Sequence, residues 1–83
     1  MSSAKKIQID YFALLREQRG CSEETVNTTA RTPSELYQEL QEKYGLSLPF
    51  SGLRIAINDE FKEKDSILKN GDRVVFIPPV AGG

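Results

Sequence analysis

The sequence contains no histidine and only one cysteine. Without histidine, the chain cannot form a Ser-His-Asp triad, a Cys-His pair or a zinc site with an imidazole ligand. It also lacks the commonest general base near neutral pH. Cys21 alone allows neither an internal disulfide nor a four-cysteine metal site. We therefore expect no metal site and no bound cofactor in this chain.

Long apolar runs and a surplus of basic residues are also missing. No segment approaches the roughly 18 apolar residues of a membrane span, and Gln8 and Asp10 interrupt the apolar stretch that a signal peptide would need. The 11 Lys and Arg residues are balanced by 12 Asp and Glu, whereas non-specific nucleic-acid binding needs a basic surplus. These features predict a cytoplasmic protein that binds neither membranes nor nucleic acid.

The chain length of 83 residues fits one small domain. A domain of this size buries only about 60–65% of the surface that its unfolded chain exposes, which leaves no room for a deep, water-excluding active site. We expect a folded domain over residues 1–77 and an extended tail over residues 78–83.

Alternation of apolar and polar residues predicts the strands. In the first of them, Ile7, Ile9 and Tyr11 point to one face of the sheet, and Phe12 points to the other. The expected strands are residues 6–12, 24–30, 53–58, 60–62 and 73–77, with turns at 58–59 and 70–72.

The strongest helix signal begins at Thr32. Thr32 is a good N-cap, Pro33 suits the first helical position, and Glu35 completes a capping box. A helix is expected over residues 33–44, ending at Gly45. The apolar stripe of this helix consists of Leu36, Leu40 and Tyr44. An ion pair is expected between Glu39 and Lys43. Two shorter helical pieces are expected, one ending at Gly20 and one over residues 65–68.

These elements predict an α+β domain in which one main helix covers one face of a mixed sheet. The segment 73–77 is almost continuously apolar, which is typical of a central strand, and Pro78-Pro79 ends it. We expect the first and last strands to lie side by side and parallel, since the long excursion between them makes that pairing possible. This arrangement is the β-grasp of ubiquitin-like proteins.

The sequence ends in Pro78-Pro79-Val80-Ala81-Gly82-Gly83. Six extended residues reach about 20 Å, Pro-Pro favours the stiff polyproline II conformation, and the small last residues suit a narrow channel. A terminal carboxylate is an anion at neutral pH and a poor electrophile, so it must be activated before it reacts. The chain has no Walker-type phosphate loop, so another protein would supply that activation. The alternative is a frayed end without a function.

The whole chain resembles the small subunit of molybdopterin synthase, a ubiquitin-like sulfur carrier. The resemblance rests on three segments, namely Tyr11-Phe12-Ala13-Leu14-Leu15-Arg16-Glu17, Asn70-Gly71-Asp72 and the tail from Pro78 to Gly83. The tail is the most specific of these, since related thiamin-pathway carriers end in Gly-Gly but usually lack the Pro-Pro.

This resemblance implies that an E1-like enzyme uses ATP to adenylate the carboxylate of Gly83, and that a sulfur donor converts it to a thiocarboxylate. The tail formed by Pro78, Pro79, Val80, Ala81 and Gly82 then threads into a large subunit. There sulfur passes to cyclic pyranopterin monophosphate, in a heterotetramer whose catalytic side chains belong to the large subunit.

Four further residues are candidates for binding the partner. Phe12, Val75 and Ile77 are expected to form an exposed apolar patch near the root of the tail. The family has hydrophobic contacts at the positions of Phe12 and Ile77, although the latter is often aromatic. Arg16 matches a family arginine near the partner surface, where it would pair with a carboxylate; the alternative is a solvated charge. Cys21 is interpreted as incidental.

Three alternatives remain open at this point. The chain is a sulfur carrier for another pathway (thiamin or tRNA thiolation), a protein modifier that joins Gly83 to a lysine, or a domain whose tail has no role. The Pro-Pro-Val-Ala stretch favours the molybdenum pathway over the first of these.

Overall fold

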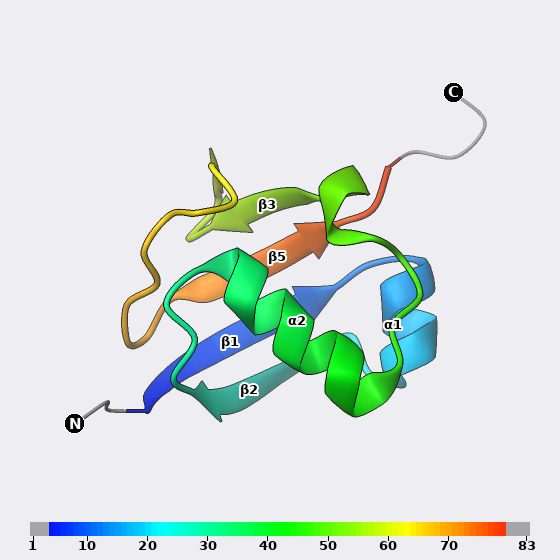
Figure 1. The fold of residues 1–83 in the computed structure, drawn as a ribbon, viewed down its shortest axis with the longest axis horizontal. Helices are drawn as coiled ribbons and strands as arrows, with labels where there is room; N and C mark the ends of the chain where they lie inside the picture. Colours follow the sequence, from blue (N-terminus) through cyan, green and yellow to red (C-terminus); the bar gives the residue numbers. More distant parts are fainter. Residues whose placement is uncertain (1–3, 80–83) are drawn as a thin grey trace.

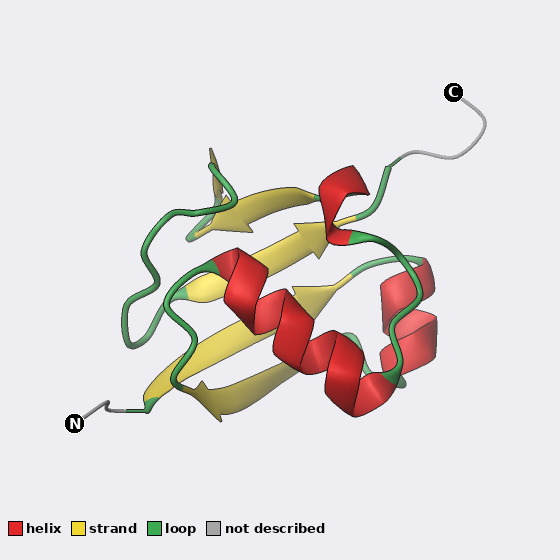
Figure 2. Cartoon of the chain, viewed as in Figure 1, coloured by secondary structure: helices red, strands yellow, loops and turns green. Residues whose placement is uncertain are grey.

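Five strands form one mixed sheet, and the longer helix packs across one of its faces (Figure 1, Figure 2). The computed structural model describes residues 4–79. The elements in chain order are β1 (Lys5–Tyr11), α1 (Leu14–Arg19), β2 (Glu23–Thr28), α2 (Pro33–Tyr44), η1 (Phe50–Gly52), β3 (Arg54–Ile57), β4 (Glu60–Lys62) and β5 (Arg73–Ile77).

The strand order is β2-β1-β5-β3-β4. β1 and β5 are parallel neighbours at the centre, with Tyr11 opposite Phe76, and the other neighbouring pairs are antiparallel. The predicted α+β class and the β-grasp arrangement are therefore confirmed. The division into a domain over 1–77 and a tail over 78–83 stays a prediction, because residues 80–83 lie outside those described.

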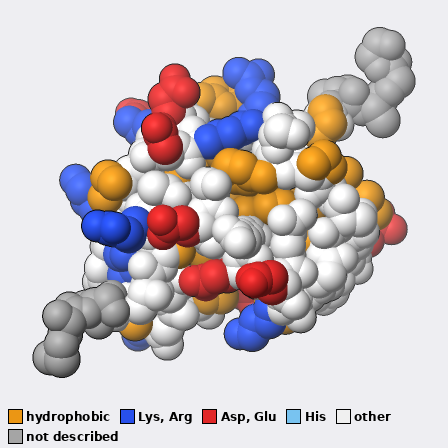
Figure 3. Space-filling model, viewed as in Figure 1, with side chains coloured by type: hydrophobic (Ala, Val, Ile, Leu, Met, Phe, Trp, Pro, Cys, Tyr) orange, Lys and Arg blue, Asp and Glu red, His pale blue; other side chains and the backbone are white. Residues whose placement is uncertain are grey.

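The core lies between the sheet and α2. β1 contributes Ile7, Ile9 and Tyr11, all at most 1% exposed, as the alternation predicts. The central strand β5 and helix α2 supply further core side chains, namely Val74, Phe76, Leu36, Tyr37 and Leu40. Figure 3 views the α2 side, where hydrophobic side chains reach the surface above α2, over β3 and β5.

Helix α2 begins and ends where the sequence predicts, and its first turn is capped. Thr32 Oγ1 accepts a 3.2 Å hydrogen bond from the backbone N–H of Glu35, and the carboxylate of Glu35 accepts one from the N–H of Arg31. The second half of the capping box thus reaches one residue further back than expected. Gly45 ends the helix with a φ of 68°, a left-handed conformation that favours glycine.

Three predictions about local structure are wrong. Residues 65–68 form no helical turn; a β-turn closes instead through a 3.1 Å hydrogen bond from Ser66 N–H to the carbonyl of Glu63. No ion pair joins Glu39 to Lys43, because the carboxylate of Glu39 instead accepts a 2.7 Å hydrogen bond from the hydroxyl of Thr28 on β2. The second strand ends at Thr28 rather than at residue 30.

Tyr44 is only partly buried against the core. Its ring lies beneath the guanidinium of Arg19, whose carbon is 3.8 Å from the ring centroid. Among residues 4–79, no helix has both the length and the apolar character that crossing a membrane requires.

Candidate functional site

The C-terminal end of β5 is the root of the tail. β5 lies between β1 and β3, and its residues Val74 and Phe76 are fully buried. After Ile77 the chain leaves the sheet through Pro78, which is partly buried, and Pro79, which is exposed (Figure 1). The tail therefore starts from a strand that neighbours hold on both sides. The other tail residues to which the sequence assigns threading and sulfur chemistry, Val80, Ala81, Gly82 and Gly83, lie outside the described residues.

Phe12 follows β1 directly and lies in a tight turn. The backbone N–H of Leu15 donates a 3.1 Å hydrogen bond to the carbonyl of Phe12, and Ala13 between them has φ 53° and ψ −127°. These angles are those of the first central residue of a type II′ turn, a position that glycine usually occupies. The turn leaves Phe12 48% exposed and Leu14 40% exposed. Two apolar side chains are thus exposed just after the strand that pairs with β5.

Arg16 lies on α1, the short helix that follows this turn. Its side chain is exposed and takes part in none of the hydrogen bonds or ion pairs between side chains in the described part of the chain. The neighbouring Leu15 is fully buried and fixes the helix against β1. The position of Arg16 is therefore compatible with the partner contact that the sequence assigns to it, and equally with a solvated charge.

A partly buried acid connects α1 to the sheet. The carboxylate of Glu24 on β2 accepts hydrogen bonds from Arg19 Nη2 at 2.6 Å, from Arg19 Nε at 2.8 Å and from the Tyr11 hydroxyl at 2.5 Å. The hydrogen bonds from Arg19 hold the pKa of Glu24 below its ordinary value, against the effect of burial. Burial, reinforced by Glu24, raises the pKa of Tyr11 far above its ordinary value. The carboxylate therefore stays charged and the phenol stays a donor at neutral pH.

The face of the sheet opposite α2 carries the other predicted contact residues, and we call it the open face. Side chains alternate along β5, so Val75 and Ile77 point to the open face. Ile77 is partly buried, but Val75 is only 6% exposed, so the prediction of an exposed patch that includes Val75 is wrong. Val75 lies opposite Asp10 on β1 and Ala56 on β3, so residues of both neighbouring strands flank it on this central strand.

Sequence reasoning missed two residues of the open face, Phe61 on β4 and Arg54 on β3. Phe61 is 64% exposed, and the guanidinium carbon of Arg54 lies 4.5 Å from its ring centroid. Arg54 is opposite Ile77 in the pairing of β3 with β5, which places it at the root of the tail. Alternation in Glu60-Phe61-Lys62 would assign Phe61 to a buried face, so the local pattern does not indicate its exposure.

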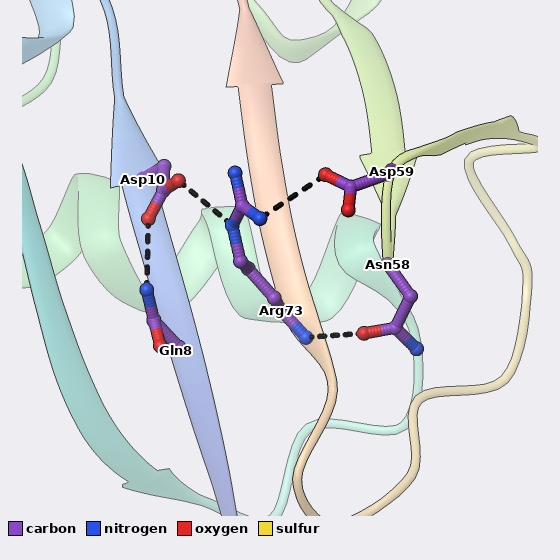
Figure 4. A network of polar contacts seen from close by, with 5 residues as sticks. All are labelled: Gln8, Asp10, Asn58, Asp59 and Arg73. Carbon is purple, nitrogen blue, oxygen red and sulfur yellow. Dashed lines mark hydrogen bonds and ion pairs between the residues drawn. The ribbon is translucent and has the colours of Figure 1, made fainter.

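A polar network crosses the open face away from the root of the tail (Figure 4). Arg73 Nε donates to Asp10 at 2.9 Å, and Arg73 Nη1 donates to Asp59 at 3.1 Å. Gln8 donates to the same Asp10 carboxylate, and the backbone N–H of Arg73 donates to the side-chain oxygen of Asn58. The network joins β1, β5 and the β3–β4 turn, and it satisfies the charge of Arg73.

The described residues offer binding surfaces rather than a set of catalytic groups. Cys21 is half-buried against the core, with no acid, base or second thiol hydrogen-bonded to it in the described part. Residues 4–79 contain no group of three or more Asp, Glu, Cys or His side chains that could hold a metal ion. The arrangement places the end of β5, from which the tail continues, near exposed apolar side chains and arginines.

Comparison with known proteins gives one matching family and several full-length relatives. The model of the ThiS family matches residues 9–83. The chain is 34% identical over 80 residues to the molybdopterin synthase sulfur carrier subunit of Haemophilus influenzae, covering 93% of this chain and 99% of the relative. These alignments confirm the resemblance that the sequence segments indicate.

Two solved structures show where this chain stands among known folds. One is a complex of subunits 1 and 2 of the molybdopterin-converting factor from Helicobacter pylori. One chain of that complex is 32% identical to this chain and matches it with a TM-score of 0.62. The match covers 94% of this chain and 99% of that one. The small archaeal modifier protein 1 of Methanosarcina acetivorans matches with a TM-score of 0.75 over 96% of this chain and 98% of that one, at 21% identity. The second likeness shows the shared fold alone.

Proposed function

Because the chain belongs to the ThiS family, we propose that it is the sulfur-carrier subunit of a molybdopterin synthase. In this proposal it donates sulfur to cyclic pyranopterin monophosphate during molybdenum cofactor biosynthesis. The observation that carries the proposal is the alignment with molybdopterin synthase sulfur carrier subunits along 93% of the chain. The family match supports a carrier, and these relatives favour the molybdenum pathway over thiamin or tRNA thiolation.

The reactive group in this proposal is the carboxylate of Gly83. A carboxylate oxygen attacks the α-phosphorus of ATP on an E1-like enzyme, and pyrophosphate leaves. Sulfide-level sulfur from a donor then attacks the acyl carbon of Gly83 and AMP leaves, which gives a thiocarboxylate. Its sulfur is a soft nucleophile like a thiolate. ATP is bound by the activating enzyme and not by this chain. A cytoplasmic location goes with the proposal, because its first step consumes ATP.

The partner in the transfer step is the large subunit of the synthase, in a heterotetramer. The complex between subunits 1 and 2 of the H. pylori converting factor supports a two-subunit assembly for this chain as well. Pro78-Pro79, directly after a buried strand, gives the tail a fixed direction of exit. A tethered sulfur has a high effective concentration at the acceptor, and insertion of the tail shields the activated end from water.

The contact surface in this proposal is the open face around the root of the tail. Phe12, Ile77 and Arg16 remain in it, and Phe61 joins them because of its exposure. Val75 is withdrawn, since a side chain that is 6% exposed has little area to offer a partner. The carrier has no activity alone, because the catalytic groups of the transfer step belong to the large subunit.

The test has a loading step and a transfer step. The full chain is incubated with ATP, an E1-like enzyme and a sulfur source, then alkylated, and the C-terminal peptide is analysed by mass spectrometry. Alkylation at Gly83 is expected, and the loaded chain should convert cyclic pyranopterin monophosphate when the large subunit is added. Oxidation at Met1 and alkylation at Cys21 also change the mass of the chain. Mapping each modification to its peptide therefore distinguishes them from sulfur at Gly83.

Each other outcome points to another function. Loading without transfer would assign the chain to a different sulfur acceptor. Lysine-linked conjugates at Gly83 would indicate a protein modifier. An unmodified Gly83, with components proven active on a known carrier, would overturn the proposal in favour of an interaction module.

A further inference from the structure

Arg54 and Phe61 form a single exposed platform on the open face. Arg54 is the first residue of β3, and its guanidinium carbon lies 4.5 Å from the ring centroid of Phe61 on β4. A cation over an aromatic face is attracted by the ring quadrupole, which restricts the orientation of the guanidinium. The cation is therefore oriented before any partner arrives.

The charge of Arg54 is not matched by a carboxylate among residues 4–79. Two other cations on these strands are matched: Arg73 pairs with Asp10 and with Asp59, and Lys62 pairs with Glu60. Arg54 takes part in none of the ion pairs of the described chain. An acidic group that approached Arg73 would meet the two carboxylates that already hold it, whereas one that approached Arg54 would meet an available guanidinium.

The platform lies at the root of the tail. Arg54 is directly opposite Ile77, the last residue of β5 before Pro78-Pro79. Arg54 and Phe61 also line an open hollow, so there is room beside the platform for a side chain of a partner. The rest of its wall is mixed, with apolar side chains such as Phe50 and Leu53 and the charged run of residues 62–65. A planar guanidinium that stacks on an aromatic ring is well suited to hold a carboxylate through two parallel hydrogen bonds.

We propose that Arg54, oriented by Phe61, binds an Asp or Glu carboxylate of the large subunit, one that is surrounded there by apolar side chains. This inference rests on the proposed function, and it deepens that function by stating the chemistry of the partner's surface. The contact sets the position of the carrier at the point where the tail enters the large subunit. Phe12 and Ile77 supply apolar area, and Arg54 supplies the directional contact.

The first experiment measures the dissociation constant of the full chain and its large subunit by calorimetry, at low and high salt. Arg54→Gln should weaken binding about tenfold, and Arg54→Glu about a hundredfold, because removing one partner of a charged contact leaves the other unpaired. The salt dependence of binding should be smaller for Arg54→Gln than for the wild type. Arg31→Gln is the matched control, an exposed arginine just before α2, and it should bind like the wild type.

The second experiment identifies the carboxylate. Surface Asp and Glu residues of the large subunit are changed to Lys one at a time, and each variant is tested with the Arg54→Glu chain. One of them should restore binding. In a double-mutant cycle, Arg54→Gln should weaken binding less in a Phe61→Leu background than in the wild type. The reason is that a leucine side chain has no aromatic face to orient the guanidinium.

The outcomes separate the two proposals. Equal binding by Arg54→Gln and wild type, an equal loss with Arg31→Gln, or no rescuing lysine would overturn the role of Arg54 while leaving the sulfur carrier intact. A wild-type chain that neither binds the large subunit nor becomes loaded at Gly83 would overturn both. Unchanged thermal unfolding of the Arg54 variants shows that the loss is one of binding and not of folding.

Discussion

The hydroxyl of Tyr11 donates a 2.5 Å hydrogen bond to Glu24, and the same carboxylate accepts two hydrogen bonds from Arg19. One acid therefore joins β1, β2 and α1. Arg19 in turn lies over the ring of Tyr44 at the end of α2. The helix that carries Arg16 is held in place by this cluster and by the buried Leu15.

Replacing Glu24 by Gln should lower the free energy of unfolding by about 2 kcal/mol at neutral pH, because hydrogen bonds to a charged group are lost and Arg19 is left unpaired. Since the pKa of Glu24 is held below its ordinary 4.5, this stabilisation is present above that pH and disappears as the pH falls through the lower, folded-state value. Urea unfolding of both chains from pH 7 to pH 3 measures it. A difference between them that does not shrink with acid would contradict this account.

Replacing Ala13 by Gly should raise the free energy of unfolding by about 1 kcal/mol, or the melting temperature by about 4–8 °C. The φ of 53° and ψ of −127° suit glycine and are costly for alanine, and this gain exceeds the entropy that glycine adds to the unfolded chain. The reciprocal control is Gly20→Ala at a φ of 83°, which should destabilise the fold. Thermal unfolding checks both, and a less stable Ala13→Gly chain would show that the turn is unstrained.

Val75 and Phe12 should respond differently to truncation. Val75→Ala should lower the free energy of unfolding by about 2 kcal/mol, because it removes buried methyl groups from a central strand. Phe12→Ala should change stability by less than about 1 kcal/mol, since half of its side chain is already in water. It should instead weaken binding to the large subunit. Denaturant unfolding beside calorimetry of binding separates the two effects, and the reverse pattern would restore Val75 to the contact surface.

Removing Gly83 should abolish loading with sulfur and leave the fold intact. The reactive carboxylate would then belong to Gly82 and would fall one residue short of the activating site. Circular dichroism should give the same melting curve as the full chain, because the sheet ends at Ile77. Loss of folding on this deletion would show that the tail also stabilises the domain. Normal loading would show that the activating enzyme does not require the full length of the tail.

Elements set by neighbouring residues were predictable from the sequence. Thr32, Pro33 and Gly45 define the ends of α2, and the alternation of Ile7, Ile9 and Tyr11 defines the buried face of β1. The arrangement of the strands also followed, because a long chain excursion and an apolar last strand leave few ways to build the sheet.

Features that depend on distant residues were not predictable. Glu39 binds Thr28 on β2 instead of the nearby Lys43, and no local pattern encodes that choice. Alternation assigns Val75 to the open face, but it does not tell whether side chains from two neighbouring strands cover that face there. The platform of Arg54 and Phe61 needs the pairing of β3 with β4, so the composition of either strand alone does not reveal it.

The parallel pairing of Tyr11 with Phe76 makes the first and last strands depend on each other. Contacts between residues this far apart in the chain form slowly and late in folding. A chain interrupted anywhere before residue 76 lacks the strand that closes the middle of its sheet, so it has neither a finished core nor a place from which a tail can leave. Under the proposed function, completion of the fold and presentation of the tail are therefore the same event, and an activating enzyme that selects the tail would also select intact carriers.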